Sequence, residues 1–260
     1  TFLPEGSVSW LYYADRINQL PLGVVGVAIG VALLPALSRN IAEGNLELAI
    51  SVQNRAIELC LVLCLPASAA FLVLAEPIAV VLFQRGEFMS SDAKATAQAL
   101  TAFAFGLPAF VLIKAFSPGF FARKDTVTPV KIAAISMVLN VILAVFLMQF
   151  LAHVGIALAT SLTAWANVFA LAVILIRRDY YRFDIHLLAR LPRIVFSTAL
   201  MAAGLLIGVD VLSTPLAGSE LSRSSALLGL IICGGSIYLV TIQVTGAFRL
   251  SDLRNKKVQD

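Results

Sequence analysis

Two ionisable residues lie deep inside an apolar segment that begins at Val8. Asp15 and Arg16 follow Val8 by seven and eight residues, which on a helix rising 1.5 Å per residue is roughly 10–12 Å along the axis. A charged side chain at that depth costs a few kcal/mol in lipid. We therefore expect Asp15 and Arg16 to face a water-filled cavity, an opposite charge or a ligand.

The chemistry that suits this pair is the binding of an anion. An arginine guanidinium donates two parallel hydrogen bonds to a phosphate or carboxylate, and low dielectric strengthens the pairing. Asp15 would hold Arg16 in place or take its charge when the ligand leaves, while Asn18 and Gln19 extend the polar stripe over about two turns. In the alternative interpretation, Arg16 extends to the outer membrane surface and Asp15 neutralises a neighbouring helix.

For each of the other polar residues within apolar segments, two interpretations are possible. Lys114 lies near the end of its segment, where it either lines a cavity or extends its ammonium group into water. Asn140 and Thr160 either form hydrogen bonds between helices or supply oxygen ligands to a hard cation such as Na⁺.

Enzymatic chemistry is not indicated. The cysteines Cys60, Cys64 and Cys233 lie in apolar runs without a histidine or carboxylate at ligand spacing, and His153 and His186 fall in predicted loops. Hydrolase, metalloprotease, Walker and dinucleotide motifs are absent from the sequence. We expect a transporter that has no organic cofactor and no nucleic-acid partner.

Composition explains how these residues are positioned. Of 260 residues, 60% are hydrophobic and 13% charged, whereas soluble domains carry about 25% charged residues. Apolar runs of roughly 20 residues match the length of a membrane-spanning helix. We predict an all-α transmembrane bundle of about seven spans: Val8–Leu37, Ser51–Leu74, Ala93–Phe116, Val127–Leu151, Val154–Ile176, Ile194–Val211 and Ser225–Val244.

The first span contains residues that favour bending. Pro21 removes a backbone hydrogen bond, and Gly23, Gly26 and Gly30 permit close packing and deformation. These four residues form a predicted hinge.

The Lys and Arg distribution predicts the orientation. Alternate loops place fourteen basic residues on one side and three, Arg85, Lys94 and Arg223, on the other. The positive-inside rule then puts the tail 249–260 in the cytoplasm and the start 1–7 outside. Residues 8–151 would form four spans and residues 152–248 three, with a basic loop or surface helix at 177–193. An odd number of spans and Thr1 as first residue lead us to expect a preceding half.

Three separated motifs carry a family resemblance. They are Val8-Ser-Trp-Leu-Tyr-Tyr-Ala-Asp-Arg16 with the following Leu20-Pro-Leu-Gly-Val-Val-Gly-Val-Ala28, Leu82-Phe-Gln-Arg-Gly-Glu-Phe88, and the stretch from Pro118-Gly-Phe-Phe-Ala-Arg-Lys-Asp125 to Lys131. In this order they resemble the MviN/MurJ family of lipid II flippases.

The resemblance implies the fold of a fourteen-helix exporter of the multidrug/oligosaccharidyl-lipid/polysaccharide superfamily, with two lobes around a cavity. This chain would supply helices eight to fourteen, with Arg16 in the cavity. The family's last two helices, which match Ile194–Val211 and Ser225–Val244, form a groove for a prenyl tail. Some relatives use Na⁺, and Asn140 and Thr160 could supply oxygen ligands for it. Residue 144, one turn after Asn140, is alanine, so this chain has no carboxylate there to bind the cation.

The function implied is transfer of lipid II, the undecaprenyl-pyrophosphate-linked peptidoglycan precursor, from the inner to the outer leaflet of the bacterial cytoplasmic membrane by alternating access. Arg16, Asp15, Asn18, Gln19 and Lys114 are the predicted substrate-binding residues. A drug/cation antiporter and a flippase for another lipid-linked oligosaccharide are alternatives within the superfamily. A non-transporting membrane scaffold is a third, in which the loop at 177–193 would matter more than the cavity charges.

Overall fold

The computed structural model of the chain describes residues 3–247, apart from the side chains of residues 27, 28 and 30. The predicted tail at 249–260 lies outside this range. Within the described residues every regular element is helical, which confirms the predicted all-α class. The helices are α1 (Ser7–Ala42), α2 (Leu46–Phe83), α3 (Ser90–Phe121), α4 (Val127–Arg177), α5 (Ile185–Val211), α6 (Ser213–Leu216) and α7 (Glu220–Val244).

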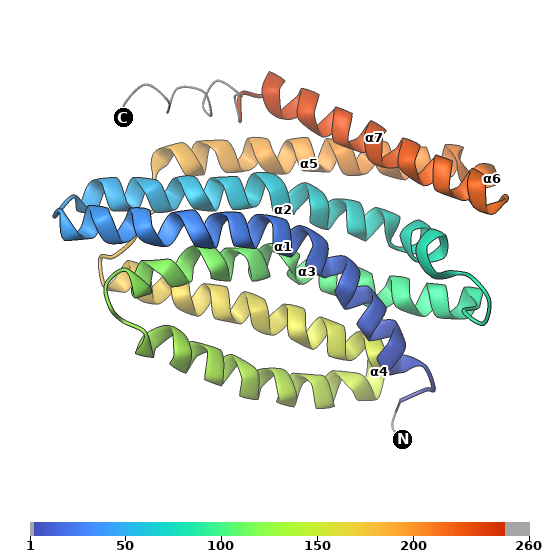
Figure 1. Ribbon diagram of the computed structural model, residues 1–260, viewed down its shortest axis with the longest axis horizontal. Helices are drawn as coiled ribbons and strands as arrows, with labels where there is room; N and C mark the ends of the chain where they lie inside the picture. Colours follow the sequence, from blue (N-terminus) through green and yellow to red (C-terminus); the bar gives the residue numbers. More distant parts are fainter. Residues whose placement is uncertain (1–2, 248–260) are drawn as a thin grey trace.

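Six of the described helices are long and apolar enough to cross a membrane. The fourth, α4, contains 51 residues and is interrupted at Ala152, whose backbone lies far from helical values at φ 47° and ψ −129°. Figure 1 shows that α4 doubles back there, so that its two halves run antiparallel. Within residues 3–247 the chain therefore crosses the bundle seven times, as the hydropathy predicted, with the turn between predicted spans four and five.

Local chemistry accounts for several helix ends. Asp92 accepts a hydrogen bond of 2.8 Å from the backbone amide of Met89 at the start of α3, and Asp184 accepts one of 3.2 Å from the amide of His186 at the start of α5. These bonds satisfy amides that have no partner within the helix. Because α5 begins after Asp184, residues 185–193 are its first turns, so the part of 177–193 from residue 185 on is helical.

The element α1 contains Pro21 and Pro35 and bends near its middle (Figure 1). A proline inside a helix removes one backbone hydrogen bond and clashes with the preceding turn. Helices α2, α3 and α5 also contain internal prolines, which membrane helices tolerate because their neighbours compensate for the lost bond.

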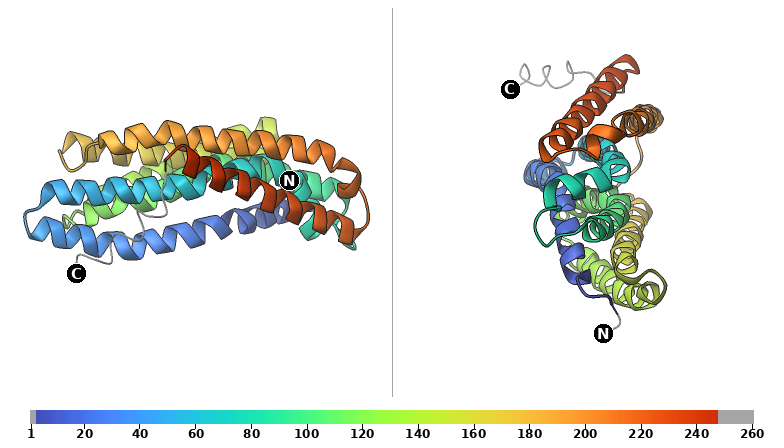
Figure 2. Two further views of the ribbon diagram at one scale, coloured as in Figure 1. Left: turned by 90° about the horizontal axis from the view of Figure 1, so that it is seen from above. Right: turned by 90° about the vertical axis from the view of Figure 1, so that its right-hand side faces the viewer.

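Helix α3 lies at the centre of the bundle and packs against α1, α2 and α4. Its many alanines permit close approach, and Gly106 lies directly against Ser161 of α4, whose hydroxyl donates a 2.7 Å hydrogen bond to the Ala102 carbonyl. Helices α5 and α7 reach this core mainly through α2. The end-on view in Figure 2 shows the resulting curved stack, with α7 at one extreme and the first half of α4 at the other.

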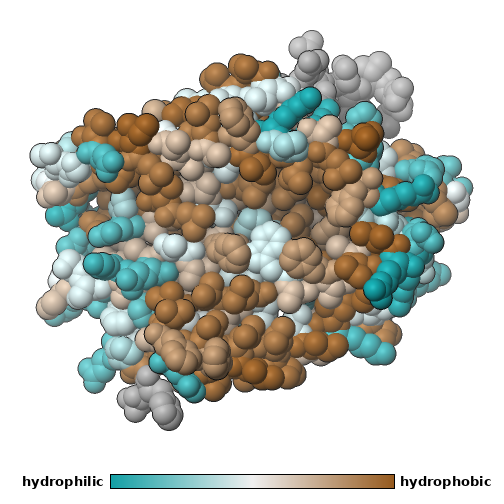
Figure 3. Space-filling model, turned by 180° about the vertical axis from the view of Figure 1, so that it is seen from behind, coloured by the Kyte–Doolittle hydropathy of each residue, from teal (hydrophilic) through white to brown (hydrophobic). Residues whose placement is uncertain are grey.

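The surface is organised in bands. Figure 3 shows an apolar middle with polar residues at the two ends, and the exposed apolar side chains include Ile135, Phe150 and Val244 at 69%, 71% and 82% exposure. Lipid is the solvent that suits such a surface. The connections at 43–45, 122–126 and 178–184 share one end, as the Lys and Arg distribution predicted, and those at 84–89 and 212–219 share the other (Figure 1).

Candidate functional site

A cavity of about 360 Å³ lies where α1, α3 and α4 meet. Its wall consists of Asp15, Asn18, Gln19, Leu22 and Gly23 of α1, Phe103, Phe110 and Lys114 of α3, and Thr160 of α4. The α1 residues recur at helical spacing, so one face of that helix supplies all five. Four of the five predicted substrate-binding residues are therefore together in one cavity.

Arg16, the fifth, does not line this cavity. Its side chain is exposed, and its guanidinium carbon lies 4.8 Å from the centre of the Tyr12 ring. Cation–π contact of this kind orients the guanidinium at the edge of the site without removing its charge.

Gln19 connects the two ionised groups. Its amide nitrogen donates to the Asp15 carboxylate, and its amide oxygen accepts a 3.3 Å hydrogen bond from Arg16. Adjacent residues on a helix point in different directions, whereas residues three or four apart share a face. Asp15 therefore acts on Arg16 through Gln19, which the sequence analysis did not foresee.

Asn18 presents a buried polar group. The residue is 2% exposed, and within the described residues its side-chain oxygen accepts no hydrogen bond. Buried amides without a partner are rare because they lose hydration without compensation. The Asn18 oxygen is thus suited to accept a hydrogen bond from a ligand in the cavity.

Lys114 reaches α1 because residue 26 is glycine. A Cβ atom placed on Gly26 would lie 2.6 Å from Cδ and 2.7 Å from Nζ of Lys114, so the lysine side chain occupies the space that any larger residue would fill. By contrast, a Cβ on Gly23 would meet nothing within 4 Å. The predicted hinge residues thus differ in surroundings, and those of Gly30 lie outside the described part of the structure.

Asn140 and Thr160 join the two halves of α4. The Asn140 amide donates to the hydroxyls of Thr160 and Thr163 at 3.3 Å and 3.0 Å, and both hydroxyls donate to carbonyls of their own helix. These bonds match the interhelical alternative of the sequence analysis. Sodium binding by Asn140 and Thr160 stays a prediction.

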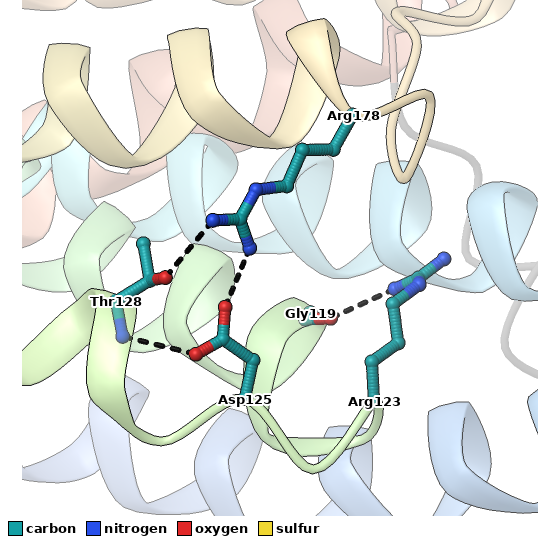
Figure 4. Close-up of polar contacts among 5 residues, drawn as sticks. All are labelled: Gly119, Arg123, Asp125, Thr128 and Arg178. Atoms are coloured by element: carbon teal, nitrogen blue, oxygen red, sulfur yellow. Dashed lines mark hydrogen bonds and ion pairs between the residues drawn. The ribbon is translucent and has the colours of Figure 1, made fainter.

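A polar corner fixes the end of the bundle where α3 joins α4 (Figure 4). Arg178 lies 2.6 Å from the Asp125 carboxylate and donates at 3.2 Å to the Thr128 hydroxyl. Hydrogen bonds from the hydroxyl and backbone amide of Thr128, with a smaller effect of Arg178, lower the pKa of Asp125 to about 2. The two ends of α4 are thereby tied together.

Arg123 extends this corner to the next connection. It donates at 2.8 Å to the Gly119 carbonyl and at 3.0 Å to that of Tyr180, whose ring centre lies 4.4 Å from the guanidinium carbon. Partial burial lowers the pKa of Arg123 from its usual value. Gly119 and Arg123 belong to the third sequence motif, so part of that motif has a structural role.

A second cavity, of about 340 Å³, is almost entirely apolar and lies between α2, α5 and α7. Pro66, Met201, Leu205, Gly234 and Tyr238 are among its lining residues. Its helices α5 and α7 contain the two spans from which the resemblance implied a groove. We call this cavity the apolar groove.

The aromatic wall of the first cavity was missed from the sequence. Phe103 and Phe110 are seven residues apart, which places them on one face of α3, and this spacing was a signal that could have been used. The contact of Lys114 with Gly26 had no such signal, because it depends on how α1 and α3 are aligned.

Comparison with known proteins agrees with this architecture. The family described as "Lipid II flippase MurJ" matches residues 1–224. The chain is 47% identical to the probable lipid II flippase MurJ of Rhizobium meliloti over 96% of its own length, and 37% identical to that of Vibrio cholerae over 98%.

A solved structure also matches. The "Lipid II flippase MurJ, inward closed conformation" superimposes with a TM-score of 0.76 at 25% sequence identity, covering 93% of this chain and 47% of that one. The chain likewise spans 47% and 48% of the two relatives above, about half their length. By sequence and by fold, the chain belongs to the MurJ family of lipid II flippases.

Proposed function

We propose that this chain forms one lobe of a lipid II flippase, which moves the precursor between leaflets without changing it chemically. A second lobe, as in relatives about twice as long, would complete the transport cavity. The observation that carries the proposal is the polar cavity between α1, α3 and α4, because it gathers charged and amide groups within an otherwise apolar bundle.

Each group in the cavity has a chemistry that suits this substrate. The Lys114 ammonium and the Arg16 guanidinium at the rim attract pyrophosphate oxygens. Asn18 and Gln19 offer amides to the sugar and peptide groups, and Phe103 and Phe110 provide apolar faces. The prenyl tail would stay in the apolar groove, whose wall is compatible with a hydrocarbon chain.

Transport by alternating access requires the lobes to change their relative position. Of the predicted hinge residues, Gly23 lines the cavity, and Gly26 lies against the lining residue Lys114. Bending there would change access to Asp15 and Lys114. We place the end with the basic connections in the cytoplasm, in the bacterial inner membrane.

The test is to replace Arg16 with alanine in the full-length protein. We expect lipid II to accumulate in the inner leaflet, with protein levels unchanged, because the guanidinium group at the rim of the cavity is lost. Arg39→Ala is the matched control, since Arg39 is an exposed arginine at the other end of α1, paired with Glu43 at 3.4 Å. Normal translocation by Arg16→Ala at normal protein level would refute the proposal.

A further inference from the structure

Prolines inside two neighbouring helices leave backbone carbonyls without their usual partner. The nitrogen of Pro108 in α3 carries no hydrogen, so the carbonyl of Ala104, four residues earlier, lacks its helical hydrogen bond. Pro66 in α2 affects the carbonyl of Val62 in the same way. Lipid offers no donor in exchange, so an unpaired carbonyl in a membrane helix is costly.

A hydroxyl group from an adjacent helix replaces the missing donor at both carbonyls. Ser68 of α2 donates a 2.6 Å hydrogen bond to the Ala104 carbonyl, and Tyr238 of α7 donates one of 2.6 Å to the Val62 carbonyl. Both side chains are buried. Because the same arrangement occurs twice, we interpret each hydroxyl as the compensation for one proline.

The break in α3 lies within the wall of the polar cavity between α1, α3 and α4. Phe103 lines this cavity before Pro108 in the chain, whereas Phe110 and Lys114 line it after. The two parts of α3 that Pro108 separates therefore present different groups to one cavity. A change of angle at Pro108, where a helix bends most readily, would move Phe110 and Lys114 relative to Phe103.

Helix α4 holds the part of α3 that precedes the break. The indole nitrogen of Trp165 donates at 3.0 Å to the Phe105 carbonyl, and Ser161 donates at 2.7 Å to the Ala102 carbonyl. Both carbonyls also have, four residues later, an amide that can donate to them within the helix. The bond from Ser68 differs, since it reaches the carbonyl that the proline leaves free.

We propose that α3 bends at Pro108 during transport and that Ser68 is a positioning residue, which holds α3 in the conformation described above by donating to Ala104. When the bend changes, Phe110 and Lys114 move relative to the rest of the cavity wall. Breaking the bond is the cost of that movement, because a buried carbonyl without a donor is unfavourable. The role in transport rests on the proposed function, whereas the hydrogen bond across the break does not.

The first experiment measures local opening of α3 in the full-length protein, purified in detergent and free of substrate. Hydrogen–deuterium exchange reports opening of the amides at 105–112. We expect Ser68→Ala to speed exchange there about tenfold, the effect of one lost buried hydrogen bond. Ser161→Ala is the matched control, because it also removes a buried hydroxyl that donates to α3. That carbonyl keeps the amide of Gly106, so exchange should stay near wild type.

Pro108→Ala tests whether the proline is what makes Ser68 necessary. Alanine restores an amide hydrogen at position 108, so the Ala104 carbonyl regains its helical partner and exchange should fall below wild type. In this background Ser68→Ala should add nothing, as a double-mutant cycle would show. An equal effect of Ser68→Ala in both backgrounds, or equal effects of Ser68→Ala and Ser161→Ala, would overturn the proposal.

Translocation separates a hinge from a break with a purely structural role. Because Pro108→Ala stabilises one shape of α3, we expect lipid II translocation to fall about tenfold. Lipid II binding, measured in detergent by native mass spectrometry, should stay at the wild-type level. Unchanged translocation, or an equal loss of binding, would overturn the hinge. If wild type neither binds nor translocates lipid II, the proposed function fails, and the exchange measurements still decide the role of Ser68.

Discussion

At the scale of single residues, the cavity depends on a lysine that occupies the space left by a glycine. The Lys114 side chain crosses from α3 to α1 where Gly26 has no Cβ atom. Sequence analysis named both residues, one as a binding residue and the other as a hinge. Their contact gives Gly26 a second role, which is to position the ammonium group.

Gly26→Ala in the full-length protein distinguishes the two roles. The new methyl group displaces the Lys114 ammonium, so we expect lipid II translocation to fall about threefold to tenfold. The upper value corresponds to the complete loss of one charge-assisted contact. Gly23→Ala, where the methyl group meets nothing, should stay near wild type. Adding Gly26→Ala to Lys114→Gln should cost nothing further. Equal losses in both glycine variants would instead favour the hinge.

Asp125 gives a prediction about pH. Its folded-state pKa of about 2 lies below the value of about 3.9 expected when unfolded. The carboxylate therefore contributes stability that is fully present above about pH 4 and is lost as the pH falls toward 2. Thermal unfolding in detergent should show wild type more stable than Asp125→Asn at pH 5, with the difference shrinking by pH 2. A difference that is independent of pH would contradict this assignment.

Which residues gather at the site could be predicted largely from the sequence. Polar groups in apolar segments have a high cost in lipid, so Asp15, Asn18, Gln19 and Lys114 stood out. How Asp15 holds Arg16 could not be predicted, because the connection runs through Gln19. Contacts between helices, such as Lys114 with Gly26, depend on axial alignment, which hydropathy does not encode.

At the scale of elements, the turn inside α4 interrupts an otherwise helical segment. Ala152 has a positive φ of 47°, a region that costs a residue with a Cβ atom of order 1–3 kcal/mol. Position 152 is neither glycine nor proline, so the residue type does not mark the turn. Hydropathy still located it, because an apolar stretch of about 50 residues is too long for one crossing.

Ala152→Gly should relieve this strain and stabilise the protein by about 1 kcal/mol. The measurement is the thermal unfolding midpoint of purified protein in detergent. Ala157→Gly makes the same change at a fully buried helical position and should lower the midpoint, because glycine is unfavourable within helices. A lower midpoint for Ala152→Gly would show that the turn is not strained.

Helix ends were less predictable than helix centres. Helix α2 runs from Leu46 to Phe83, whereas hydropathy indicated 51–74, and α6 was not predicted. Helical hydrogen bonding continues into the polar layers on each side of the apolar band, where hydropathy gives no signal. For the same reason hydropathy left the start of α5 as either a loop or a surface helix; in the structure Asp184 accepts a hydrogen bond from the His186 amide there, and Glu58 pairs with Arg190.

At the scale of the whole molecule, the two ends of the bundle differ in charge, and this difference predicts an orientation. Glu87 and Lys124 are exposed and lie at opposite ends. In a Cys233→Ala background, where Cys60 and Cys64 are buried, a membrane-impermeant maleimide should label Glu87→Cys in intact cells. Lys124→Cys should be labelled only after permeabilisation. The reverse pattern would invert the topology.

The peripheral position of α7 has an evolutionary consequence. Its neighbours are chiefly α5, α2 and the short α6, so lipid is in contact with most of its surface, and substitutions among apolar residues there disturb few partners. The match to the family ends at residue 224, just after α7 begins. We expect α7 to diverge faster between species than α3, whose side chains are enclosed by three other helices.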